Sequence, residues 1–273
     1  MVGPPTTQSA LAATPRSEAS TRVAALGTIL GVWAHPDDEA YLSAAVMRLA
    51  LENGQRVACV TATSGERGTA DPASWPPEKL GAARRRELQA SFAALQSGLG
   101  DIIEHEWLGY RDEHCADAAG EAAASELGAV IDRIQPDTVL TFGPGGLTGH
   151  PDHQAVAEWV SIALGSRPSI RRLDAVVAAS WVEHIQERVE IDSYFDDGYP
   201  EVVDDAEIDL NLVLDEALWT VKDRALHAHA TQTQPVFEHL KPELWRAFSI
   251  VESFRTHSIS NPTGRERMLR ETP

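Results

Sequence analysis

The sequence has few cysteines, no long apolar run and fewer basic than acidic residues. Cys59 and Cys115 are its two cysteines, and neither belongs to a C-x-x-C pair, so we expect neither a disulfide framework nor a cysteine zinc site. No apolar stretch reaches the roughly 20 residues that a membrane-spanning helix needs, so we expect no membrane insertion. The formal net charge of -18 argues against a nucleic-acid ligand.

The N-terminal region could be mistaken for a targeting signal. Arg16 and Arg22 precede the apolar run at 23–34, but cleavage after Ala34 would remove the first predicted core strand, so we predict a cytoplasmic chain. Residues 1–22 are rich in Pro, Thr, Ser and Ala and lack an apolar period, which predicts a disordered extension. We expect a core at 23–183 and a C-terminal portion at 184–273.

Strand and helix patterns alternate along the predicted core. Apolar runs predict strands near residues 29, 57, 103, 138 and 175, and helical spacing of apolar residues predicts helices between them. This alternation favours an α/β fold with a Rossmann-like, doubly wound, mostly parallel sheet. Beyond residue 183 the pattern becomes acidic and irregular, and we expect a smaller α+β portion that packs on the sheet and roofs the site.

A histidine and three acids crowd the end of the first predicted strand. His35, Asp37, Asp38 and Glu39 stand where the next helix begins. Acids are ordinary residues at a helix start, because they cap it and suit its dipole, but a histidine is not favoured there. Since ligands bind at the carboxyl ends of strands in open α/β sheets, this cluster indicates a functional site.

A second cluster repeats this arrangement after the fourth predicted strand. His150, Asp152 and His153 follow a Gly-rich loop and begin another helix. Two imidazoles and one carboxylate are a frequent catalytic zinc set that leaves one position open for water. A nearby carboxylate outside the ligand set can take the proton of that water, and a spare histidine can stabilise an oxyanion or protonate a leaving amine. These residues leave the reaction open, since a metal-dependent phosphoesterase would use a similar set.

Together the two clusters resemble the LmbE / PIG-L family of zinc-dependent N-deacetylases. The similarity extends to residues 64–68, 109–112 and 222–232. It implies a zinc ion held by His35, Asp38 and His153, and iron(II) also suits such ligands. It further implies that Asp37 is the general base, which later passes its proton to the leaving amine.

The resemblance implies roles for five more residues. His150 would stabilise the oxyanion as an imidazolium, and Asp152 would orient it. Arg67 and Asp112 would contact the sugar or its substituent, and His229 would line the pocket. One position departs from the family, because Thr148 stands where some members have a tyrosine that assists the carbonyl oxygen. Either Thr148 takes no part in the reaction, or another group such as Tyr110 or His229 assists the carbonyl oxygen.

The implied activity is removal of an N-acetyl group from an N-acetylglucosamine-containing small molecule or glycoconjugate. An amidase for a larger N-acyl group, as on thiol conjugates, is the alternative, and a non-catalytic carbohydrate-binding module on the same fold is a third reading. A dinucleotide-binding oxidoreductase is disfavoured, because acidic residues occupy the place of the G-x-G-x-x-G turn. The sequence leaves open the natural substrate and whether the chain forms a homo-oligomer.

Overall fold

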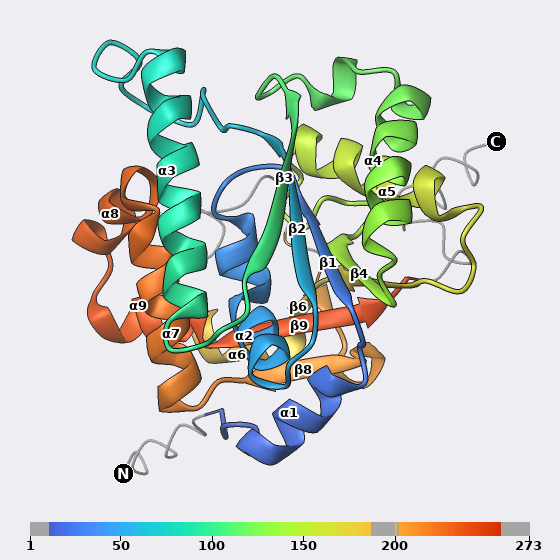
Figure 1. Ribbon diagram of the computed structural model, residues 1–273. Helices are drawn as coiled ribbons and strands as arrows, with labels where there is room; N and C mark the ends of the chain where they lie inside the picture. Colours follow the sequence, from blue (N-terminus) through green and yellow to red (C-terminus); the bar gives the residue numbers. More distant parts are fainter. Residues whose placement is uncertain (1–10, 187–199, 201, 258–273) are drawn as a thin grey trace, which may run out of the picture.

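A mixed sheet of seven strands forms the centre of the computed structural model, which describes residues 11–186, 200 and 202–257 (Figure 1). The strand order is β3–β2–β1–β4–β5–β9–β8, and the first five strands run parallel to one another. These strands are β1 (Ile29–Trp33), β2 (Val57–Thr63), β3 (Ile103–Tyr110), β4 (Thr138–Phe142), β5 (Arg171–Ala175), β8 (Leu210–Val213) and β9 (Val251–Thr256). A separate parallel pair is formed by β6 (Val177–Ala178) and β7 (Val202–Val203).

Helices cover both faces of the sheet. On one face α2, α3 and α7 contact one another, and on the other α4 packs against α5 (Figure 1). The helices are α1 (Arg16–Ala24), α2 (Asp38–Glu52), α3 (Pro77–Gln96), α4 (Gly120–Ile134), α5 (Pro151–Leu164), α6 (Ala179–Gln186), α7 (Glu216–Ala228), α8 (Ala230–His239) and α9 (Pro242–Ser249). Within the described ranges, none of these helices combines the length and the apolar character needed to cross a membrane.

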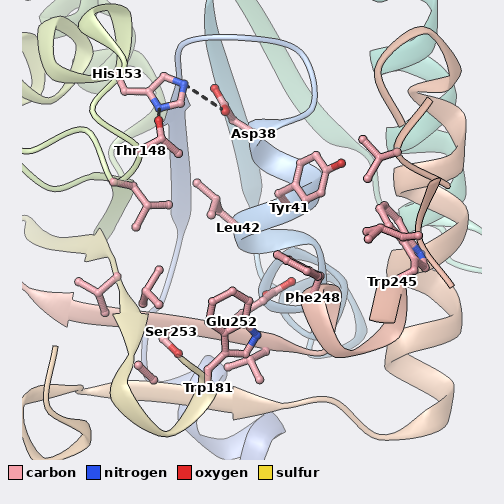
Figure 2. Close-up of a pocket in the computed structure, with 17 residues that line it drawn as sticks. Asp38, Tyr41, Leu42, Thr148, His153, Trp181, Trp245, Phe248, Glu252 and Ser253 are labelled. Carbon is pink, nitrogen blue, oxygen red and sulfur yellow. Dashed lines mark hydrogen bonds and ion pairs between the residues drawn. The ribbon is translucent and has the colours of Figure 1, made fainter. Parts of the chain in front are cut away.

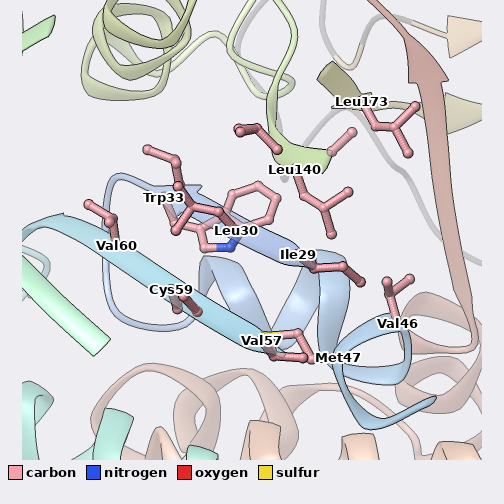
Figure 3. Packing of buried hydrophobic residues seen from close by; sticks show 14 of the residues in the cluster. Ile29, Leu30, Trp33, Val46, Met47, Val57, Cys59, Val60, Leu140 and Leu173 are labelled. Atoms are coloured by element: carbon pink, nitrogen blue, oxygen red, sulfur yellow. The ribbon is translucent and has the colours of Figure 1, made fainter. Parts of the chain in front are cut away.

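The central strands are buried along their whole length. Every residue of β1, β2 and β4 is buried, as expected for parallel strands that have helices on both faces. Figure 3 shows Ile29 and Val57 of neighbouring strands close to Met47 of α2, within one continuous apolar core. This core fixes the loops that leave the carboxyl ends of β1 and β4. The predicted α/β class and the mostly parallel, doubly wound sheet are confirmed.

The N-terminal prediction is wrong for the part of 1–22 that the structure describes. Helix α1 begins at Arg16, and Ala19 and Val23 on its inner face are buried in the core. The chain before it is anchored too, because the amide of Thr14 donates to the carbonyl of Val213 at 2.8 Å. The sequence did not predict this helix, because it is short and only Ala19 and Val23 mark its buried face. Residues 1–10 lie outside the described residues.

The C-terminal portion is less separate than the sequence suggests. β9 pairs antiparallel with β5, and β8 pairs with β9, so both strands extend the main sheet across the expected boundary at residue 183. The strand predicted near residue 175 is β5, which ends at Ala175, and the short strand β6 and helix α6 follow it. The sequence did not separate these elements, because one apolar run at 175–179 spans the end of β5, the strand β6 and the start of α6.

A buried ion pair joins this portion to helix α2. Lys222 Nζ lies 2.9 Å from Glu252 Oε1, and both side chains are fully buried. The Glu252 carboxylate also accepts the amides of Ala45 and Val46, at 2.8 and 3.0 Å, while Lys222 donates to the Tyr41 carbonyl at 2.7 Å. The pair therefore ties α7 and β9 to the middle of α2.

Replacing Lys222 with Met should strongly destabilise the fold, because it leaves the Glu252 carboxylate buried without its cation. Removing one partner of a buried pair typically costs about 3–5 kcal/mol in the free energy of unfolding. Urea denaturation measures this loss. Lys241→Met, at an exposed lysine, is the matched control and should change the free energy by less than about 0.5 kcal/mol. Equal stability of the two variants would contradict a structural role for the pair.

Candidate metal centre

The two histidine clusters meet at the switch point of the sheet. β1 lies between β2 and β4, so the connections that leave β1 and β4 diverge to opposite faces. Ligands bind in the crevice that such a divergence opens at the carboxyl ends of the strands. The loop after β1 supplies His35 and starts α2 at Asp38, and the loop after β4 leads to α5, which contains His153.

Three side chains bring donor atoms close together at this edge of the sheet. His35 Nδ1 lies 3.1 Å from His153 Nε2. Asp38 Oδ2 lies 3.7 Å from His35 Nδ1, and Asp38 Oδ1 lies 3.4 Å from His153 Nε2. Atoms that bind a tetrahedral zinc ion at about 2.0–2.2 Å lie roughly 3.3 Å from one another. All three side chains are about nine-tenths buried, with exposed fractions of 10%, 11% and 9%. Their spacing and chemistry therefore fit a divalent metal ion.

Hydrogen bonds behind the centre fix how His35 presents its ring. His35 Nε2 lies 3.1 Å from Asp112 and 3.2 Å from Asp152, so Nδ1 faces the candidate metal position. Burial lowers the pKa of His35, but the hydrogen bonds to these two carboxylates outweigh it and raise the pKa to about 10. Metal binding near neutral pH would therefore displace a proton from this ring.

The other two candidate ligands are oriented by backbone groups. His153 Nδ1 lies 3.0 Å from the Gly146 carbonyl, which leaves Nε2 facing the site. Burial lowers the pKa of His153 well below its usual value, and the neighbouring His35 lowers it further, so this ring is neutral. Asp38 Oδ2 accepts the amides of Ala34 and His35, at 3.2 and 2.8 Å. Partners of this kind are typical of metal-binding histidines and carboxylates.

Asp37 stands beside the centre in a strained conformation. Its φ of 122° is rare for a residue with a side chain, and such strain persists only where neighbours enforce it. Glu39 accepts the Asp37 amide at 3.0 Å. Arg84, which is 3% exposed, donates to the Pro36 carbonyl at 2.6 Å and to Asp37 Oδ2 at 3.1 Å. Burial raises the pKa of Asp37 to about 6, although Arg84 opposes the rise, and such a value suits a base near neutral pH.

Sequence reasoning missed the role of Arg84 and misplaced His229. Arg84 belongs to a basic run that we expected to be solvated, yet it lies four residues from both Leu80 and Leu88 on the buried face of α3, which was the available signal. His229 is fully buried and lies 2.8 Å from the Glu39 carboxylate. It therefore does not line the pocket as expected, but supports the acid that holds Asp37.

His150 lies over the centre. Its ring centroid is 4.8 Å from that of His35, and its Nδ1 accepts the amide of Asp152 at 3.1 Å. A backbone amide can only donate, so Nδ1 is the acceptor in this contact and Nε2 is the ring atom left to donate. Its role toward the oxyanion stays a prediction. The Asp152 carboxylate instead contacts His35 and accepts the amides of Glu113 and Cys115. Its backbone, rather than its carboxylate, orients His150.

The two residues expected to contact a sugar differ in accessibility. Asp112 is 3% exposed, contacts His35, and accepts the Arg67 amide at 2.7 Å, so it supports a candidate ligand instead of facing the substrate. The Arg67 side chain is 37% exposed and pairs with Glu113, so its contact with substrate stays a prediction. Tyr110 bonds to Glu126 at 3.0 Å, away from the centre.

A cavity of about 350 Å³ opens beside the centre, with Asp38, Thr148 and His153 at one end (Figure 2). Thr148 Oγ1 lies 3.3 Å from His153 Nδ1. The position that departs from the family pattern therefore contacts a candidate ligand directly. The rest of the wall is mainly apolar and includes Tyr41 and Trp245.

A family model and several curated proteins match this chain in sequence. The family model described as PIG-L, GlcNAc-PI de-N-acetylase, matches residues 30–164. A 1D-myo-inositol 2-acetamido-2-deoxy-alpha-D-glucopyranoside deacetylase of Actinosynnema mirum is 30% identical over 232 residues, which cover 75% of this chain and 80% of the relative.

Two solved structures share the fold at low sequence identity. N,N'-diacetylchitobiose deacetylase from Pyrococcus horikoshii has a TM-score of 0.58 at 19% identity, covering 87% of this chain and 88% of its own. The A40926 pseudoaglycone deacetylase Dbv21 has a TM-score of 0.60 at 20% identity, covering 87% of this chain and 100% of its own. At identities this low, the similarity supports the fold alone. The reaction has to be inferred from the residues of the candidate metal centre.

Proposed function

Because the chain belongs to the PIG-L family of deacetylases, we propose that it is a metal-dependent hydrolase of N-acetyl groups. Its substrate would be an N-acetylglucosamine-containing small molecule or glycoconjugate, the class named for the Actinosynnema mirum relative. One observation carries the proposal: His35 Nδ1 and His153 Nε2 lie 3.1 Å apart, and each lies within 3.7 Å of one carboxylate oxygen of Asp38, beside the buried carboxylate of Asp37.

We propose zinc as the bound metal, with iron(II) as the alternative that the same donors accept. His35, Asp38 and His153 would hold it. A metal ion bound there would polarise the amide carbonyl and lower the pKa of a water molecule. The two imidazoles and one carboxylate leave a position open for that chemistry.

The surrounding side chains supply the proton transfers. Asp37 takes a proton from a water molecule while the oxygen of that water adds to the amide carbon. The C–N bond then breaks as Asp37 gives the proton to the departing nitrogen. His150 donates from Nε2–H to the carbonyl oxygen as negative charge develops there. Acetate and a free amine leave, and no other reactant is consumed.

Both motifs retain every residue of the proposed machinery, which disfavours a non-catalytic carbohydrate-binding module. The cavity beside the centre gives weight to the alternative, an amidase for larger N-acyl groups. A cytoplasmic location remains a prediction from the sequence, which leaves the oligomeric state open.

The proposal is tested by incubating the protein with N-acetylglucosamine derivatives and quantifying acetate and free amine together. We expect the two products in equal amounts, loss of activity after chelator treatment, and recovery on adding back zinc or iron(II). Chelator-treated protein with undiminished amide hydrolysis would contradict the metal-dependent mechanism.

Arg84→Met should lower kcat about 10–100-fold, as for other supporting residues of metal sites. Met preserves much of the buried length but removes the donors to Pro36, Gly65 and Asp37, so the base loses its fixed orientation. Metal content should not change, because Arg84 contacts no candidate ligand in the described structure. Arg86→Met, at an exposed arginine of the same helix, is the control and should keep kcat. A kcat for Arg84→Met equal to that of the control would contradict the positioning role.

A further inference from the structure

The cavity beside the metal centre is far larger than an acetyl group requires. Asp38 and His153 form one end, and Trp181 and Ser253 lie at the other (Figure 2). Its volume of about 350 Å³ falls in the range of small-molecule pockets. An acetyl group would place only one methyl group in this cavity, so the substrate would leave most of the volume unoccupied.

The walls of this cavity, here called the chamber, suit an apolar group rather than a sugar. Its lining comes largely from apolar and aromatic side chains of α6, α8, α9, β6 and β9. Two polar residues of the lining already have partners: Glu252 binds Lys222, and Ser253 Oγ donates to Asn211 at 2.9 Å. Sugar hydroxyls buried here would lose hydrogen bonds to water without replacement, which disfavours a glycan.

The position of Asp37 decides which end of the amide enters the chamber. Asp37 returns a proton to the departing nitrogen in the proposed reaction, so the amine must lie on its side of the centre. Asp37 does not line the chamber, and its carboxylate contacts Arg84 of α3. The acyl substituent, which leaves the carbonyl carbon in the other direction, is then the part that faces the chamber.

We propose that the chamber binds the acyl chain of the substrate, and that the enzyme cleaves medium-length apolar N-acyl groups more efficiently than N-acetyl groups. This inference rests on the proposed metal-dependent amide hydrolysis, and it changes the favoured acyl group from acetyl to a medium-length chain. Water adds to the carbonyl carbon and the C–N bond breaks as before, so the products are a medium-chain carboxylate and an amine.

A chain-length series tests this preference directly. N-acetyl-, N-butanoyl-, N-hexanoyl- and N-octanoylglucosamine share one amine, so kcat/KM reports the acyl chain alone. Each methylene that enters an apolar site should raise kcat/KM up to about fourfold, and the octanoyl substrate should exceed the acetyl substrate by roughly a hundredfold or more. A kcat/KM that is flat or falls with chain length overturns the inference and leaves the proposed function standing. If no member of the series is hydrolysed, the proposed function itself fails.

Two matched variants locate the effect. Val177 lines the chamber, and its register partner Val202 in the adjacent strand is 46% exposed and does not line it. Val177→Phe should reduce the ratio of octanoyl to acetyl kcat/KM at least about tenfold, because the ring occupies space that the chain needs. Val202→Phe adds the same ring outside and should leave the ratio unchanged. Equal ratios in the two variants would place the acyl chain elsewhere.

A binding measurement separates the chamber from catalysis. Acetate and octanoate carry the same carboxylate, so a difference in their affinity for the metal-loaded protein reports the alkyl chain. Octanoate should bind at least about a hundredfold more tightly and change the fluorescence of Trp181 and Trp245, which line the chamber. Val177→Phe should weaken octanoate binding and not acetate binding. Equal affinity of the wild-type protein for the two carboxylates would overturn the inference.

Discussion

Asp37→Asn is expected to lower kcat by about 10²–10⁴-fold while the protein keeps its metal. Asn matches Asp in size and tolerates positive φ better than most residues, so the strained turn at 122° should survive the change. The variant nevertheless lacks a group that can accept the proton of water. In the part of the chain that the structure describes, the Asp37 carboxylate bonds to Arg84 and not to His35 or His153, so the candidate ligands should stay in place.

Steady-state kinetics and metal analysis on the same preparation measure this outcome. Asp101→Asn, at an exposed position before β3, is the matched control and should be indistinguishable from the wild type. An Asp37→Asn variant that hydrolyses normally would remove Asp37 from the mechanism. A variant that also loses its metal would mean that Asp37 is a ligand instead of a base.

His153→Ala should abolish both metal binding and turnover. The substitution removes one of the three donor atoms, and the other two, from His35 and Asp38, cannot hold a divalent ion against water at comparable affinity. We expect the metal affinity to fall by more than the 10–100-fold that follows loss of a supporting residue. The stacked contact between His153 and Phe142, with centroids 4.1 Å apart, is also lost, so circular dichroism should first confirm that the variant is folded.

His227→Ala is the matched control for this experiment, because the His227 side chain is 51% exposed on α7 and contacts no candidate ligand. It should retain full metal content and activity. A folded His153→Ala protein that binds metal as tightly as the control would show that the ligand set includes another residue. His150 is the nearest alternative, since its ring centroid lies 5.0 Å from that of His153.

The sequence predicted where the site lies better than it predicted which residues orient the candidate ligands and Asp37. His35 and His153 were expected to meet because the carboxyl ends of parallel strands share one edge of a sheet, and that topology can be read from alternating strands and helices. The same reasoning could not place Arg84, Asp112 or His229. Their functions depend on contacts between α3, α7 and the loops after β1 and β3, which only the packed fold defines.

Burial accounts for most of the differences between prediction and structure. The family resemblance assigned Asp112 to the substrate, but its side chain is buried against His35. Glu39 was expected to be a simple helix-start acid, yet it is fully buried and bonded to Asp37 and His229. Sequence patterns identify polar residues near a strand end, and they do not say which of them the fold covers.

The central claim is that a metal held by His35, Asp38 and His153 is required for hydrolysis beside Asp37. A titration of metal-stripped protein with zinc, with N-deacetylase activity measured at each point, tests it most directly. The account predicts no activity without metal and a linear rise that stops at about one equivalent per chain. Asp37→Asn should bind the same equivalent and stay inactive. Full activity of the stripped protein, or activity that follows zinc equally well in His153→Ala, would contradict the account.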